Sequence, residues 1–189
     1  ITNKSFYNIL NLVLKSNKVK FFQLRLKKES EKKKIIIAKK IFKICKKNKV
    51  KFIINDDPYL ALKVNAHGCH LGQKDMTINL AKKILKNKII GITCHNSIKL
   101  ANAAIKDKAD YLAFGAFYST RTKKTKYKSS FNIIKKVRNI TKTPIVAIGG
   151  INSDNYKKLL LNKANLLAIS GYIWKNKKFK PFEAIKKLK

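Results

Sequence analysis

The sequence has 189 residues, and 45 Lys and Arg residues against 9 Asp and Glu give it a formal net charge of +36. Hydrophobic residues make up 45% of the chain, which excludes a disordered basic tail and is enough to build a buried core. The longest apolar runs, such as residues 35–38, are too short to span a membrane, and three widely spaced cysteines suit a reducing cytoplasm better than a disulfide scaffold. We therefore expect one globular cytoplasmic domain over residues 1–189, without membrane association.

The positive charge first suggests a nucleic-acid partner. However, all but three of the basic residues are lysine, the exceptions being Arg25, Arg121 and Arg138. Surfaces that clamp phosphates or read bases favour arginine for its bidentate geometry. The lysines accompany abundant Ile and Asn, whose codons are also AT-rich, so we interpret most of them as coding bias on solvated faces. A nucleic-acid or membrane-surface role is the minority alternative.

Short apolar runs typical of buried strands recur along the chain and alternate with amphipathic helical stretches. We expect strands at residues 19–24, 50–54, 69–71, 89–92, 111–114, 145–148 and 166–169. Helical spacing of apolar residues appears at 9–14, 37–44, 80–85, 98–105, 133–137 and 156–161. This alternation indicates βα units and a parallel sheet.

Eight such units would form a (β/α)8 TIM barrel. Seven strands are visible, and Ile1 and Thr2 stand where an earlier strand would end, so we expect most of the first strand to be absent from this chain. The alternative is an open doubly wound sheet, but the G-x-G-x-x-G turn typical of its first strand is not present. All seven glycines fall in strands or at their ends, which favours positions where backbone approaches a ligand.

The functional site of a barrel lies at the carboxyl ends of its strands. Asp56 and Asp75 follow two of the expected strands, and in a chain this poor in acids they suggest a hard cation such as Mg²⁺. Asp57 could equally be the cap of the next helix. Arg25 and Lys27 share one face of an extended segment, where they could clamp a phosphate or pyrophosphate.

Two later strand ends carry glycine. Gly149-Gly150 and Ser170-Gly171 are typical of a barrel phosphate site built from backbone N–H groups. The doublets Cys69-His70 and Cys94-His95 could instead suggest a soft-metal site or a nucleophile with its base. Their spacing matches no common zinc pattern and no third orienting group is evident, so core packing is the preferred interpretation.

These motifs resemble, in order and over nearly the whole chain, those of the thiamine phosphate synthase family. The matching segments are 22–27 with Q-x-R-x-K, 54–57 with I-N-D, 68–76 with G-V-H-L-G-Q-x-D-M, 91–97 with G-V-T-C-H-x-S, 109–123 with A-D-Y-V-A-F-G-A-F-x-x-T-x-T-K, and 146–151 around the Gly-Gly pair. The fold of that family is a (β/α)8 barrel, in agreement with the strand count.

The resemblance implies a transferase that joins hydroxymethylpyrimidine diphosphate to a thiazole phosphate, giving thiamine phosphate and pyrophosphate, with Mg²⁺ as cofactor. By motif, the pyrimidine diphosphate would be bound by Gln23, Arg25, Lys27, Asn55 and Lys123. Mg²⁺ would be held by Asp56 and Asp75, and the residues with catalytic roles would be Thr93, Lys123 and Arg25. The thiazole phosphate would be held by Thr120, Thr122, Gly150, Ile169 and Ser170.

Some positions depart from the family pattern. His67 replaces an Asp, and Lys108 and Lys163 each replace a Gly. A lysine in a left-handed helix cap costs up to about 1 kcal/mol, so these changes affect stability rather than chemistry. Two alternatives remain beside the synthase, namely a thiazole tautomerase on the same barrel and a basic nucleic-acid-binding protein. Partners would be small phosphorylated molecules, and the sequence leaves a homo-oligomer open.

Overall fold

The structure is a computed structural model that describes residues 4–120 and 126–188. Strands and helices alternate through both ranges, as expected. The chain divides into two compact units, Ile1–Ile90 and Gly91–Lys189. No helix within the described residues is long and apolar enough to cross a membrane.

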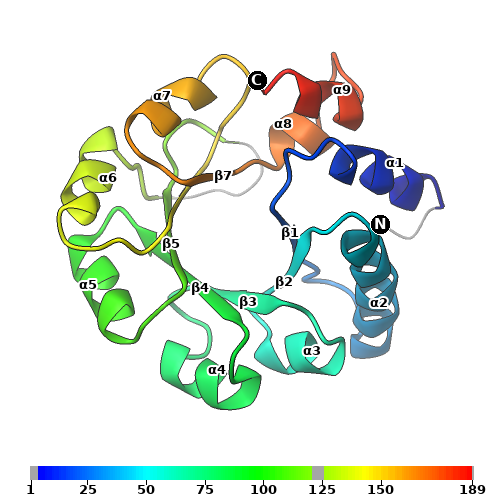
Figure 1. Ribbon diagram of the computed structural model, residues 1–189, viewed down its shortest axis with the longest axis horizontal. Helices are drawn as coiled ribbons and strands as arrows, with labels where there is room; N and C mark the ends of the chain where they lie inside the picture. Colours follow the sequence, from blue (N-terminus) through cyan, green and yellow to red (C-terminus); the bar gives the residue numbers. More distant parts are fainter. Residues whose placement is uncertain (1–3, 121–125, 189) are drawn as a thin grey trace. The chain divides into compact units, whose positions relative to one another are not determined.

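The first unit contains three parallel strands in chain order. Its strands are β1 (Phe21–Leu24), β2 (Lys51–Asn55) and β3 (Gly68–Leu71), and its helices are α1 (Lys4–Leu14), α2 (Glu31–Lys47), α3 (Pro58–Lys63) and α4 (Ile78–Leu85) (Figure 1). Consecutive apolar residues of β2, Phe52 to Ile54, are all buried, as in a strand covered on both faces.

The second unit is also built of parallel strands in chain order. Its strands are β4 (Ile89–His95, which begins in the first unit), β5 (Tyr111–Gly115), β6 (Ile145–Ile148) and β7 (Leu166–Ala168). Its helices are α5 (Ile98–Lys106), α6 (Phe131–Arg138), α7 (Tyr156–Leu161), α8 (Gly171–Trp174) and α9 (Pro181–Lys186). All seven expected strands are therefore present. The expected end of an earlier strand, at Ile1 and Thr2, lies outside the described residues.

Four helices end in the same left-handed cap. The second residue after each helix has a φ between 52° and 68°, and the next residue donates its N–H to a carbonyl five positions back, as in a Schellman motif. The left-handed residues are Lys49, Asn65, Lys108 and Lys163. The two lysines that replace the family's glycine therefore do occupy the conformation that glycine favours.

The side chain two residues after such a cap ties the next strand to its neighbour. His67 accepts a hydrogen bond at Nδ1 from the N–H of Phe52 (2.9 Å), and Asn165 accepts one at Oδ1 from the N–H of Ile145 (2.8 Å). A carboxylate would accept the same bond, so His67 in its neutral form can replace the family's Asp without loss of the contact.

Replacing Lys163 by Gly is expected to raise the free energy of unfolding by about 0.5–1 kcal/mol, because the left-handed φ of 68° then carries no Cβ penalty. Urea denaturation measures the change. Lys158, an exposed residue in the middle of the six-residue α7, is the matched control. Its replacement by Gly is expected to lower stability by about 1 kcal/mol, since helix interiors disfavour Gly. Equal losses in both variants would contradict the strain at Lys163.

His67 makes stability depend on pH. Burial, and then Lys51 and Lys88, lower the pKa of His67. As pH falls through the imidazole's unfolded value of about 6.5, the unfolded chain takes up a proton that the folded chain resists, so stability is lost on the acid side. His67→Asn keeps an acceptor for Phe52 without titrating, and we expect it to lose less stability between pH 7.5 and 5.5 than the unchanged chain. Parallel losses in urea denaturation would refute this role.

Candidate functional site

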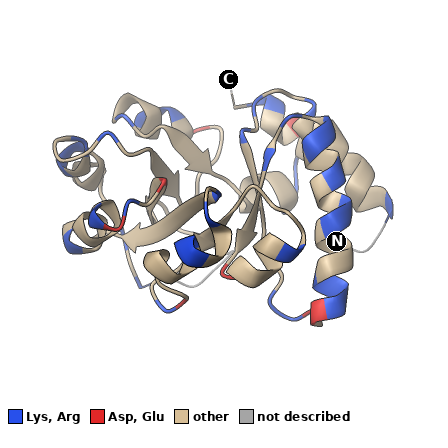
Figure 2. Cartoon of the chain, turned by 60° about the horizontal axis from the view of Figure 1, so that its bottom comes forward, with Lys and Arg blue, Asp and Glu red and all other residues tan. Residues whose placement is uncertain are grey.

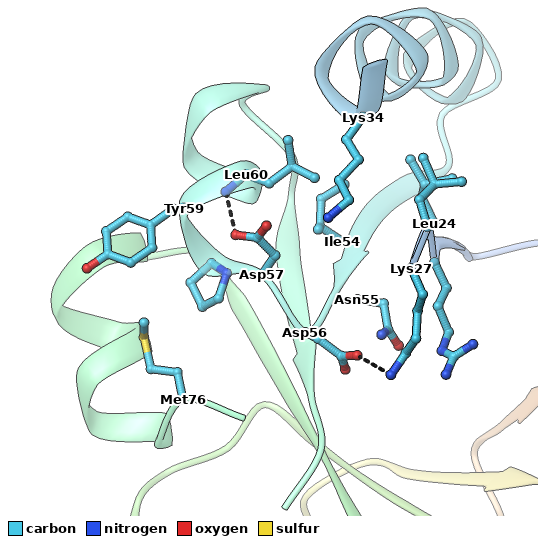
Figure 3. Close-up of a pocket in the computed structure, with 13 residues that line it drawn as sticks. Leu24, Lys27, Lys34, Ile54, Asn55, Asp56, Asp57, Tyr59, Leu60 and Met76 are labelled. Atoms are coloured by element: carbon cyan, nitrogen blue, oxygen red, sulfur yellow. Dashed lines mark hydrogen bonds and ion pairs between the residues drawn. The ribbon is translucent and has the colours of Figure 1, made fainter. Parts of the chain in front are cut away.

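The carboxyl ends of β1 and β2 open onto a cleft of about 440 Å³ in the first unit (Figure 3). Leu24 of β1 is paired with Ile54 of β2, so Arg25, which follows β1, lies beside Asn55, the last residue of β2. Four of the predicted site residues line this cleft, namely Arg25, Lys27, Asn55 and Asp56. The structure thus brings together the basic and acidic residues that the motifs predicted for a diphosphate and a metal ion.

Asp56 is held in an uncommon backbone conformation with a φ of 66°, and its N–H donates to the carbonyl of His70 (2.7 Å). Its Oδ2 lies 3.6 Å from Nζ of Lys27. Burial, and then the hydrogen-bonded, negatively charged Asp75 side chain, raise the pKa of Asp56, whereas Lys27 and Arg25 lower it. Two carboxyl groups therefore face each other at this strand end, and a cation between them would relieve their repulsion.

Asp75 is folded back toward β3 by the turn that follows this strand. Its Oδ2 accepts a hydrogen bond from the N–H of Gly72 (2.7 Å). A Cβ at Gly72 would lie 2.8 Å from the same oxygen, so glycine makes room for the carboxylate.

The Asp56–Asp75 pair suits Mg²⁺ better than it suits a metal ion whose ligands all come from protein side chains. Among the described residues no group of three or more His, Cys, Asp or Glu side chains could hold a metal ion. Mg²⁺ is commonly bound by one or two carboxylates and completes its octahedron with water and substrate phosphates. The donor set on these two strand ends therefore fits a magnesium ion that arrives with a diphosphate.

Asp57 lies beside this pair but has a different role. Its Oδ1 accepts a hydrogen bond from the N–H of Leu60 (2.9 Å), which caps α3, and Pro58 occupies the first turn of that helix. Of the two roles considered for Asp57, the structure shows the helix cap.

The second unit contains the predicted phosphate loop after β6. Gly149 and Gly150 have φ values of 105° and 65°, and a Cβ on Gly150 would lie 2.3 Å from the carbonyl oxygen of Ser119. Asn155 donates a hydrogen bond from Nδ2 to the carbonyl of Gly150 (3.0 Å), and its main-chain carbonyl accepts a hydrogen bond from the O–H of Tyr118 (3.0 Å). These two hydrogen bonds hold the loop in place.

Two further predicted residues follow the neighbouring strand. Ile148 of β6 is paired with Ala168 of β7, so Ile169 and Ser170 leave the sheet next to the Gly149–Gly150 turn. Ser170 precedes α8, and its carbonyl accepts the N–H of Trp174 (2.9 Å). The backbone groups predicted to bind the thiazole phosphate thus lie next to each other at the carboxyl ends of β6 and β7.

The remaining predicted site residues lie in or after the strands β1, β4 and β5. Gln23 is an exposed residue of β1, Thr93 is half-buried in β4, and Thr120 is half-buried after β5. Thr122 and Lys123 lie outside the described residues. The predicted pyrimidine-diphosphate and Mg²⁺ residues that are described belong to the first unit, and those for the thiazole phosphate, with Thr93, belong to the second.

The cysteines are core residues. Cys45, Cys69 and Cys94 are fully buried, and burial raises the pKa of each thiol to about 12. Such thiols stay protonated at neutral pH and are poor nucleophiles and metal ligands. His95 stacks on Tyr127, with ring centroids 3.9 Å apart. These observations favour packing over the soft-metal and nucleophile alternatives.

Among the residues that line the cleft, the sequence did not single out Lys34, Tyr59 and Met76 as site residues. Lys34 is in the first turn of α2, and Tyr59 in that of α3. Their position just after a strand end is the one sequence signal that could have found them, because first turns of helices border the site in parallel α/β folds.

Parallel βα units that present a carboxylate pair, basic residues and a glycine turn at their strand ends define a TIM-barrel-like enzyme for phosphorylated substrates. The chain belongs to the thiamine monophosphate synthase family, whose model matches residues 1–173. The expected family and the expected transferase class are therefore confirmed.

Individual relatives agree with this assignment. The chain is 68% identical to a thiamine-phosphate synthase of Pelagibacter ubique over all of this chain and 91% of the relative, and 45% identical to one of Clostridium tetani over 80% and 72%. It is similar to the solved thiamine phosphate pyrophosphorylase of Pyrococcus furiosus, with 27% identity and a TM-score of 0.87 over 99% of this chain and 88% of that one. The TIM-like α/β fold is thus shown.

Proposed function

We propose that the chain catalyses thiamine phosphate formation by joining hydroxymethylpyrimidine diphosphate to a thiazole phosphate. The observation that carries this proposal is Asp56, which lines one cleft with Arg25 and Lys27 and is hydrogen-bonded to the carboxyl group of Asp75. Such a set suits a diphosphate that binds with Mg²⁺. The names of the relatives give the product, thiamine phosphate, and the resemblance of the motifs implies the two substrates.

In the proposed reaction the bond between the pyrimidine methylene carbon and a diphosphate oxygen breaks, and the thiazole nitrogen bonds to that carbon. Pyrophosphate leaves with the electron pair, so the barrier falls when its growing negative charge is stabilised. Mg²⁺, held by Asp56 and Asp75, would supply part of that stabilisation. Arg25 and Lys27 would donate charge-assisted hydrogen bonds to the same oxygens.

The remaining predicted residues orient the two substrates. Gln23 and Asn55 would hold the pyrimidine substrate, Thr93 would lie near the reacting carbon, and Lys123 would contact the diphosphate. The thiazole phosphate would be bound by Thr120, Thr122, Gly150, Ile169 and Ser170. The thiazole nitrogen attacks with its own lone pair, so the reaction needs no general base.

A thiazole tautomerase would need the phosphate loop alone. The intact Arg25, Lys27, Asn55 and Asp56 set in the first unit favours the synthase, because an isomerase of a monophosphate has no use for a diphosphate and metal site. Incubating the purified protein with either the thiazole carboxylate phosphate or the two synthase substrates separates the two activities. We expect product only from the second mixture, whereas isomerisation of the first would support the tautomerase.

The surface charge supports no separate nucleic-acid function. Figure 2 shows Lys and Arg over the helices and loops of both units, including the whole length of α2. This distribution is what solvated helix faces would give. We further propose that the chain works in the cytoplasm as one (β/α)8 domain on small phosphorylated partners, alone or as a homo-oligomer.

A further inference from the structure

Lys34 reaches the diphosphate cleft from a different element than the other basic residues. It lies in the first turn of α2, where its N–H donates to the carbonyl of Ser30 (2.9 Å). It is half-buried, whereas the preceding Lys32 and Lys33 are exposed. Figure 3 shows its side chain extending from α2 toward Ile54, which lines the same cleft.

The charges next to Lys34 are already paired. Nζ of Lys33 lies 2.6 Å from Oε2 of Glu29, and Nζ of Lys63 lies 3.0 Å from Oε1 of Glu31. Within the cleft, Lys27 faces Asp56. In the part of the chain that the structure describes, Lys34 takes part in none of these ion pairs. Lys34 is therefore the cleft lysine whose charge is not offset by a carboxylate.

A diphosphate brings more negative charge than Arg25 and a partly offset Lys27 can balance. The first turn of a long helix adds the positive end of its dipole, and the N-terminal turn of the 17-residue α2 borders this cleft at Lys34. We propose that Lys34 is a further binding residue for the diphosphate group of the substrate, and for the pyrophosphate that leaves. This inference rests on the proposed function of the cleft.

Lys33 provides a matched control. It precedes Lys34 on the same helix and carries the same charge, but it is exposed and paired with Glu29. Lys34→Met and Lys33→Met each lower the net charge by one and keep an apolar stem. The probe is inorganic pyrophosphate with Mg²⁺, titrated into each protein by calorimetry at 150 mM salt, where exposed charges are largely screened. Thermal unfolding checks that each variant is folded.

We expect Lys34→Met to weaken pyrophosphate binding about tenfold, the usual size of one charge-assisted hydrogen bond. Lys33→Met should change it less than twofold, and Lys34→Arg should restore most of the affinity. In steady-state kinetics, Lys34→Met should raise KM for the pyrimidine diphosphate and leave KM for the thiazole phosphate unchanged.

Equal affinities for pyrophosphate in Lys34→Met and Lys33→Met would overturn the role of Lys34 while leaving the synthase proposal intact. If the unchanged protein neither binds pyrophosphate with Mg²⁺ nor forms thiamine phosphate, the proposed function fails and this inference with it. Weak binding that Lys34→Arg does not restore would also count against a direct contact, because arginine can supply the same charge.

Discussion

Asp56→Asn is expected to lower kcat/KM for thiamine phosphate formation by about 100- to 1,000-fold, the usual cost of losing a principal charge-stabilising group. Asn removes the negative charge that would hold Mg²⁺, while it tolerates the left-handed φ of 66° well. The loss should therefore come from the site and not from the backbone. Initial rates at several Mg²⁺ concentrations measure it, and we expect higher Mg²⁺ to restore part of the activity.

Asp57→Asn is the control for this prediction. The change removes one negative charge from the adjacent position, but Asn is as good a helix cap as Asp and can still accept the N–H of Leu60. We expect its activity to stay within a few-fold of the unchanged protein. If both variants lose activity alike, the cleft responds to its total charge, and the assignment of Asp56 as the ligand is wrong.

Gly150→Ala is expected to raise KM for the thiazole phosphate more than tenfold and to lower stability by about 1–3 kcal/mol. The new Cβ would lie 2.3 Å from the carbonyl oxygen of Ser119 at a φ of 65°, so the loop has to move. Movement displaces the backbone N–H groups that would bind the phosphate. Substrate titration gives the two KM values, and urea denaturation gives the stability.

Ser153→Ala is the matched control for Gly150→Ala. Ser153 lies in the same loop between β6 and α7 and donates to Asp154 (2.9 Å), without a predicted contact to substrate. We expect both of its KM values to be unchanged. An unchanged KM for the thiazole phosphate in Gly150→Ala, with the protein folded, would remove this loop from the site.

The strands were predictable because parallel strands covered on both faces consist of continuous apolar residues. β4 is an exception, because it continues to His95, beyond its expected end at Ile92. The polar residues Thr93 and His95 interrupt the apolar run in the sequence, although Cys94 between them is buried. Helix α8 was not predicted, since four residues are too few for a helical pattern to emerge, and α9 was not predicted either.

The site was predictable where residue types were scarce. Arg25 is one of three arginines, and Asp56 and Asp75 are two of nine acids, so each stood out at a strand end. Lys34 could not be distinguished among so many lysines until its half-burial and the ion pairs of its neighbours were known. The cap formed by Asp57 and the acceptor role of His67 likewise depend on hydrogen bonds that no sequence pattern specifies.

We propose above that this cleft binds a diphosphate together with Mg²⁺ during substrate coupling. The most direct test supplies the purified protein with the pyrimidine diphosphate and the thiazole phosphate, and measures thiamine phosphate and pyrophosphate with Mg²⁺ or with EDTA. We expect both products to form in equal amounts with Mg²⁺, and we expect EDTA to abolish the formation of both. No product with Mg²⁺, or equal rates in EDTA, would contradict it.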